Sequence, residues 1–170
     1  MRITIDRDLK LRSYNISDKP FLYKNSIDPI FLRYMEFTKF SLKQFSSWLK
    51  KKLMAKNTIF FVIEYKKNPI GTYILTISGI KKQKCDLSYG IASEYFGRGI
   101  FKKITKKILG KFKDIKRFEV ITRADNQASV NGLKRLNFKK EGILRSYYYD
   151  LKDRKYFDAL ILSYISSKNK

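Results

Sequence analysis

The chain has 170 residues with 38 Lys and Arg against 15 Asp and Glu, so its formal charge is +23, and it contains no histidine. The missing histidine excludes Ser-His-Asp triads, Cys-His pairs, His-ligated zinc and HExxH helices. Proton transfer must therefore use carboxylates, Tyr, Ser, Lys, Cys, backbone groups or water.

Length and composition predict one domain over residues 1–170, with a flexible tail at 166–170. Hydrophobic residues make up 44% of the chain and aromatic residues 15%, which is enough for a core. The single cysteine, Cys85, has no intrachain disulfide partner and favours a reducing compartment. Residues 1–7 lack the apolar stretch of a leader, and no run approaches membrane-spanning length. We expect a soluble cytoplasmic protein that does not enter a membrane.

The positive charge has two interpretations. It is typical of nucleic-acid-binding proteins. It also accompanies abundant Lys, Ile, Asn, Tyr and Phe and scarce Ala and Pro, the composition that an A+T-biased genome produces. In either case, a basic surface attracts anionic ligands and repels cationic ones.

The first 80 residues predict a strand, three helices and a β-hairpin. The strand covers residues 9–14, the helices run from 18 to 25, from 28 towards 35 and onward from 41, and the hairpin strands cover 58–65 and 70–80. The third helix begins with the capping box Ser41-Leu42-Lys43-Gln44. The hairpin strands are rich in β-branched and aromatic residues, and turn residues 66–69 join them.

The second half alternates strands and helices. Strands are predicted at 85–91, 117–122, 138–149 and 155–164, and helices follow the Gly97-Arg98-Gly99 turn and residue 126. This order predicts an α/β fold, of the α+β type, with a mixed sheet and helices on both faces.

One segment, Ile91 to Ile100, has the pattern of an anion site. A strand runs into a Gly-Arg-Gly turn and then into a helix. Glycines let the backbone approach a ligand, and the free amides and dipole of a helix N-terminus attract a pyrophosphate. Two glycines before a helix can also be a turn without a ligand.

Further motifs follow this segment: Asn126-Gln127-Ala128-Ser129, Leu136-Asn137-Phe138, Glu141-Gly142-Ile143-Leu144-Arg145 and a late Asp158. Together they resemble the GNAT acetyltransferase superfamily, in the branch of ribosomal-protein alanine/serine N-acetyltransferases and related amino-sugar N-acetyltransferases. The resemblance covers about Cys85 to Asp158. It implies the GNAT fold, with a central, mostly antiparallel sheet, and acetyl-CoA as the acetyl donor.

The resemblance also implies cofactor-binding residues. The backbone of Ile91 would pair with the pantetheine arm of coenzyme A, and Asn126 would contact the cofactor near its pantetheine amides. The pyrophosphate would lie on the amides of Gly97, Arg98, Gly99, Ile100 and Phe101. No metal is expected, because these amides meet the pyrophosphate.

Several positions depart from the family pattern. Ser93 replaces the usual Pro, Phe96 the usual Gln or Arg, and Phe101 the last Gly or Ala. The side chains of Phe96 and Phe101 are expected to narrow the turn that would hold the pyrophosphate. Alternatively, Phe101 packs inward as part of the apolar face of the helix. Leu133 stands where many GNAT enzymes have a tyrosine acid, and Asp86 where this branch often has Glu.

Two catalytic residues are predicted. The resemblance puts Ser129 near the thioester sulfur, where it can hydrogen-bond the leaving thiolate or relay a proton; alternatively, Ser129 only caps its helix. Asp86 is the candidate base, acting through water because its side chain is short; alternatively, it is a solvated strand residue or the partner of a lysine. The backbone amide of Ile91 is the candidate oxyanion donor.

The sequence therefore predicts an acetyl-CoA-dependent N-acetyltransferase acting on a primary amine of a protein N-terminus, an amino sugar or another small molecule. The alternative is a catalytically inactive acyl-CoA-binding or basic ribosome- or nucleic-acid-associated module on the same fold. The charge favours an anionic acceptor such as a nucleotide-linked amino sugar over polyamines or basic protein tails. The segment 26–40 is expected to overhang the site and shape acceptor choice. We also expect weak, non-specific binding to polyanions, and a monomer or homodimer.

Overall fold

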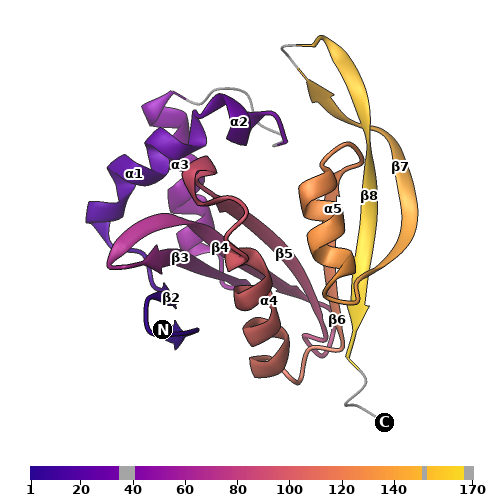
Figure 1. The fold of residues 1–170 in the computed structure, drawn as a ribbon, viewed down its shortest axis with the longest axis horizontal. Helices are drawn as coiled ribbons and strands as arrows, with labels where there is room; N and C mark the ends of the chain where they lie inside the picture. The colour runs from indigo at the N-terminus through magenta and orange to yellow at the C-terminus, as the bar shows by residue number, and fades with distance from the viewer. Residues whose placement is uncertain (35–40, 151–152, 167–170) are drawn as a thin grey trace.

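Eight strands of the computed structural model form one sheet, in the order β1-β2-β3-β4-β5-β6-β8-β7 (Figure 1). The structure describes residues 1–34, 41–150 and 153–166. The strands are β1 (Arg2–Thr4), β2 (Leu9–Arg12), β3 (Thr58–Tyr65), β4 (Asn68–Ser78), β5 (Lys84–Ile91), β6 (Arg117–Arg123), β7 (Lys139–Asp150) and β8 (Lys155–Ile165). All neighbouring strands are antiparallel except β5 and β6, which are parallel. The mixed, mostly antiparallel sheet is confirmed.

Helices cover both faces of this sheet, as predicted. They are α1 (Lys19–Ser26), α2 (Pro29–Leu32), α3 (Leu42–Met54), α4 (Ile100–Lys111) and α5 (Gln127–Lys134), with 3-10 turns η1 (Ile16–Asp18) and η2 (Ser93–Tyr95). Alternate β3 residues separate two cores. Phe61 belongs to the cluster that includes α4 and α5, whereas Phe60 belongs to the cluster formed with α1 and α3. None of the described helices is both long and apolar enough to cross a membrane.

The parallel pair β5 and β6 separates soon after it begins. Only Lys84 to Asp86 pair with Arg117 to Glu119, although both strands continue for several residues. At the far end of β5, the amide of Ala92 donates to the carbonyl of Ile70 in β4. Because successive amides of a strand point to opposite sides, the amide and carbonyl of Ile91 face the separation. The backbone of β5 is thus available to a ligand there.

Several boundaries differ from the sequence prediction. Strand β1 was missed; its three residues pair with the end of β2. The hairpin turn is only Lys66 and Lys67, both with positive φ (49° and 67°), so that β4 begins at Asn68. Helix α2 ends at Leu32, and the predicted continuation towards Met35 lies outside the described residues, as do 36–40.

The C-terminal end differs from the prediction at Ser166. Its amide donates to the carbonyl of Lys116 at 2.8 Å and its side chain is buried, so this residue is anchored to the sheet. The rest of the predicted tail, 167–170, lies outside the described residues.

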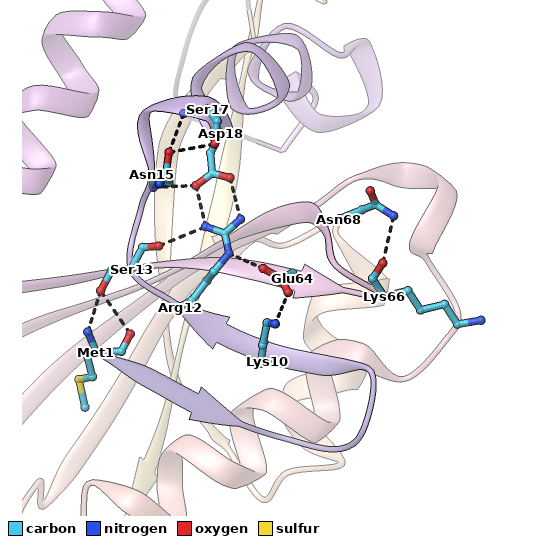
Figure 2. Close-up of polar contacts among 10 residues, drawn as sticks. All are labelled: Met1, Lys10, Arg12, Ser13, Asn15, Ser17, Asp18, Glu64, Lys66 and Asn68. Carbon is cyan, nitrogen blue, oxygen red and sulfur yellow. Dashed lines mark hydrogen bonds and ion pairs between the residues drawn. The ribbon is translucent and has the colours of Figure 1, made fainter.

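An ionic network joins η1 to β2 and β3 (Figure 2). The guanidinium of Arg12 donates two hydrogen bonds of 2.7 Å to Asp18 and one to Glu64, which also pairs with Lys10. The amide of Asn15 donates to the same Asp18 carboxylate at 2.8 Å. Since Asp18 is 2% exposed and Glu64 7%, this network fixes the start of α1 against the sheet.

Candidate active site

A row of free amides lies at the start of α4. Gly97 and Gly99 have φ of +75° and +68°, which L residues rarely adopt. No backbone carbonyl of the described chain accepts from the amides of residues 97–102; the first such bond runs from Lys103 to Gly99. A Cβ at either glycine would meet no atom within 4 Å. The amides and the positive end of the helix dipole thus face open space, and they fit a pyrophosphate.

The large side chains of this segment leave the amides open. Phe101 packs inward, with its ring centroid 4.2 Å from that of Tyr89 and its edge against Gly132 of α5. This is the inward alternative considered for Phe101. Phe96 is 56% exposed. Arg98 stacks on Tyr95 at 5.1 Å and donates to the carbonyl of Glu94.

Asn126 and Ser129 meet at the start of α5. Asn126 is the N-cap, because its side-chain oxygen accepts from the amide of Ser129 at 3.1 Å. The alternative that Ser129 caps the helix is therefore wrong. The Ser129 hydroxyl instead lies 2.7 Å from the hydroxyl of Tyr89 on β5.

Tyr89 is a candidate site residue that the sequence analysis missed. Its ring stacks between Phe101 and Tyr73, and burial raises the pKa of its hydroxyl to about 12, although the hydrogen bond with Ser129 opposes this. Tyr89 is thus protonated at neutral pH and can donate to Ser129. Leu133, at the usual tyrosine position, is fully buried. The available signal was the alternation of β5, which puts Tyr89 on the face towards α4 and α5.

A cavity of about 220 Å³ adjoins the Tyr89–Ser129 pair. Ser88 and Gly90 of β5 line it, together with residues of α1, α2, α3, β4, β6 and β7. A Cβ on Gly90 would lie 2.1 Å from the ring of Phe31, so the missing side chain lets α2 lie directly on β5. The part of the 26–40 segment that the structure describes thus borders the cavity, as expected.

Asp86 lies on the same face of β5 as Ser88 and Gly90, just before β5 and β6 separate. Its carboxylate does not line the cavity. Since a strand rises about 3.3 Å per residue, the Cα atoms of Asp86 and Ser88 lie about 7 Å apart, so a chain of water molecules is needed to link the carboxylate to the cavity. Partial burial and the neighbouring Glu119 raise the pKa of Asp86, so its carboxylate is more basic than usual.

Cys85 and the run Tyr147-Tyr148-Tyr149 can also be placed relative to the site. Cys85 is fully buried and burial raises the pKa of its thiol to about 12, so it is an unreactive core residue. Of Tyr147, Tyr148 and Tyr149, only Tyr148 is buried, and it lines the cavity.

The model of a family described as the acetyltransferase (GNAT) domain matches residues 8–139. The chain belongs to the GNAT family. It is an acetyl-CoA-dependent N-acetyltransferase, as predicted from the sequence. The comparisons give no support to the inactive alternative.

Solved structures share the fold of this GNAT protein at low identity. A RimL ribosomal L7/L12 alpha-N-protein acetyltransferase in complex with coenzyme A is 19% identical, with a TM-score of 0.86 and coverage of 97% of this chain and 98% of that chain. The microcin C7 self-immunity acetyltransferase MccE, in complex with acetyl-CoA and AMP, is 20% identical, with a TM-score of 0.81 and coverage of 96% and 95%.

A spermidine N-acetyltransferase from Vibrio cholerae, in complex with CoA and spermine, is 20% identical, with a TM-score of 0.84 and coverage of 96% and 98%. No curated protein sequence matches the chain significantly.

Proposed function

We propose that this GNAT enzyme acetylates a primary amine held in the cavity beside Ser129 and Tyr89. The observation that carries this proposal is the position of the hydroxyl pair, which adjoins the cavity at one end of α5 while Phe101 links Tyr89 to the start of α4. Acetyl-CoA supplies an activated thioester when bound. The amides of Gly97, Arg98, Gly99, Ile100 and Phe101 hold its pyrophosphate, since none of them has a backbone partner in the described chain.

Ile91 and Asn126 complete the cofactor site in this proposal. The amide and carbonyl of Ile91 face the separation between β5 and β6, where an extended arm can pair with them as an additional strand would. The same amide is the candidate oxyanion donor. Asn126 lies at the edge of the cavity. Because its side-chain oxygen is used by the amide of Ser129, its amide nitrogen is the group that faces a ligand.

Protons move through two groups in this proposal. The Ser129 hydroxyl donates to the leaving sulfur and is polarised by Tyr89, whose own proton stays in place below its raised pKa. Asp86 accepts the proton of the amine through water, and its raised pKa supports this role.

The wider properties are proposals as well. One domain spans residues 1–170, and the protein works in the cytoplasm as a monomer or homodimer. The formal charge of +23 supports weak, non-specific binding to polyanions. The acceptor is a protein N-terminus, an amino sugar or another small amine; the structural neighbours include an acetyltransferase of a ribosomal protein, one in complex with AMP and one in complex with spermine.

Two measurements test the proposal. Acetyl-CoA should raise the melting temperature saturably, and free adenine nucleotides should reproduce only part of that shift. An assay of thiol release should then detect turnover with at least one member of a panel of N-terminal peptides, amino-sugar nucleotides and polyamines. Absence of any shift at millimolar acetyl-CoA contradicts the proposed cofactor site.

A further inference from the structure

Several aromatic rings line the cavity together with Ser129. Phe31 and Tyr34 come from α2 and the turn after it, Phe45 and Trp48 from α3, and Tyr148 from β7. Phe45 and Trp48 lie with ring centroids 5.9 Å apart. Rings from three separate elements thus converge on one space, and such a space favours a planar, apolar group over a flexible hydrated chain.

Among the described residues that line this cavity, only Lys52 carries a charge. It is half-buried on α3, and within the described ranges its ammonium has no hydrogen-bond or ion-pair partner. Lys52 follows Trp48 by four residues, so the two side chains are neighbours on one face of the helix. The Cβ atoms of the two residues therefore lie about 5–6 Å apart, so a cation and an aromatic ring rise from neighbouring positions of α3.

No described carboxylate faces Lys52 across the cavity. Three acidic residues from elements around the site have partners elsewhere: Asp125 and Asp150 both pair with the buried Arg123, at 2.7 and 2.8 Å, and Asp28 caps α2. An acceptor that carries several ammonium groups would meet a cation and no carboxylate of the described chain. An anionic acceptor, in contrast, would have the charge that complements the cavity.

We propose that the acceptor amine is carried by a nucleotide, whose base stacks among the aromatic rings and whose phosphate pairs with Lys52. This inference rests on the proposed function and assigns its acceptor class. A nucleotide combines the planar ring and the anionic group that Trp48 and Lys52 present side by side. A phosphate accepts charge-assisted hydrogen bonds from the lysine ammonium. The amine then extends from the bound nucleotide towards Ser129, which lines the same cavity.

Trp48 provides a direct test, because it is the only tryptophan of the chain. Its fluorescence should change saturably with adenosine monophosphate in the presence of saturating coenzyme A, which prevents the probe from occupying the cofactor's own nucleotide site. Adenosine should bind at least tenfold more weakly, because it lacks the phosphate. Spermidine and phenylalanine should leave the signal unchanged over the same concentration range. Stronger binding of either one than of adenosine monophosphate overturns the proposal.

Two matched variants locate the phosphate. Lys52→Gln should weaken adenosine monophosphate about tenfold and leave adenosine unaffected. Lys51→Gln makes the same charge change at the next position of α3, where the side chain is exposed, and should leave both affinities unchanged. Equal effects of the two variants overturn the assignment to Lys52. If acetyl-CoA shifts the melting temperature but adenosine monophosphate does not bind, the acceptor class fails and the proposed function stands.

Discussion

The hydroxyl of Tyr89 lies 2.7 Å from the hydroxyl of Ser129, although 40 positions separate the two residues. Tyr89 comes from β5 and Ser129 from α5, and Phe101 of α4 packs against the tyrosine ring. A short hydrogen bond to a phenol polarises a serine hydroxyl, which by itself is a weak acid. The usual tyrosine position of the family, Leu133, is buried in the core, so in our proposal a tyrosine from β5 supports the serine instead.

Loss of either hydroxyl should therefore slow turnover and leave cofactor binding nearly intact. Ser129→Ala should lower kcat by about 100-fold, and Tyr89→Phe by about 10-fold because the phenol acts through the serine. Steady-state kinetics and acetyl-CoA titrations measure both quantities. The double variant should resemble Ser129→Ala alone, since the two groups act as a unit. If the losses in kcat add up in the double variant, or if kcat and the affinity for acetyl-CoA fall equally, the pair has a structural role and no catalytic one.

The proposed role of Asp86 predicts the acid limb of the pH profile. Because the base must be ionised, kcat/KM should rise as the pH increases through the raised pKa of Asp86. Glu119→Gln removes a neighbouring negative charge, so the pKa of Asp86 should fall and the limb should move to lower pH. Asp86→Asn should abolish the limb together with most of the activity. A limb that stays in place in both variants belongs to another group.

Cofactor binding should require glycine at position 99 because of its positive φ, and not because a larger side chain would clash with its neighbours. In Gly99→Ala, the new Cβ meets no atom within 4 Å, but φ of +68° costs about 1–2 kcal/mol for an alanine. The turn should relax away from this conformation and the affinity for acetyl-CoA should fall, as calorimetry can measure. Gly110→Ala, in the last turn of α4 with no atom near its Cβ, is the matched control and should raise stability by at most about 0.5–1 kcal/mol. Unchanged affinity in Gly99→Ala would argue against the amide row as the pyrophosphate site.

Gly90→Ala should affect the acceptor and spare the cofactor. Its Cβ would lie 2.1 Å from the ring of Phe31, so α2 must move away from β5. We expect a higher KM for the acceptor with little change in the affinity for acetyl-CoA. Adding Phe31→Ala removes the clash and should restore the melting temperature without restoring the KM, because the ring itself borders the cavity. Recovery of both in the double variant would mean that Phe31 does not contact the acceptor.

The Arg12 network should make stability depend on pH. Burial raises the pKa of Asp18 and Glu64, but hydrogen bonds outweigh it and hold both pKa values below their usual range: Arg12 donates to Asp18, and Lys10 and Arg12 donate to Glu64. A lowered carboxyl pKa stabilises the fold above the unfolded pKa, near 4, and this stability is lost as the pH falls through the folded pKa. Denaturant unfolding from pH 7 to pH 2 measures this loss.

Removing Arg12 should reveal the same network. Arg12→Met leaves two buried carboxylates with fewer partners and should lower the free energy of unfolding by about 3 kcal/mol at pH 7. The difference from the wild type should shrink in acid, where the carboxylates are protonated. A difference independent of pH would indicate lost packing and not lost charge pairing.

The sequence by itself determined most of the elements and the family of this protein, and it indicated the loop that we propose for the cofactor. Those features are local: the run of β-branched and aromatic residues at 58–65, the capping box at Ser41 and the Gly97-Arg98-Gly99 turn each depend on a few consecutive residues. Boundaries that neighbours decide were missed, as for β1, whose three residues form a strand only because β2 lies beside them.

Only the tertiary structure decided which side chains meet at the site. The Tyr89–Ser129 pair and the contact of Phe31 with Gly90 join elements far apart in the chain, and so does the cavity that Lys52 and Trp48 of α3 line together with Ser129 of α5. Such contacts depend on how the sheet twists and where β5 and β6 separate, and no local pattern encodes them. The +23 charge, visible from the start, acquires a specific meaning only at Lys52, because that cation lines a cavity where no described carboxylate pairs with it.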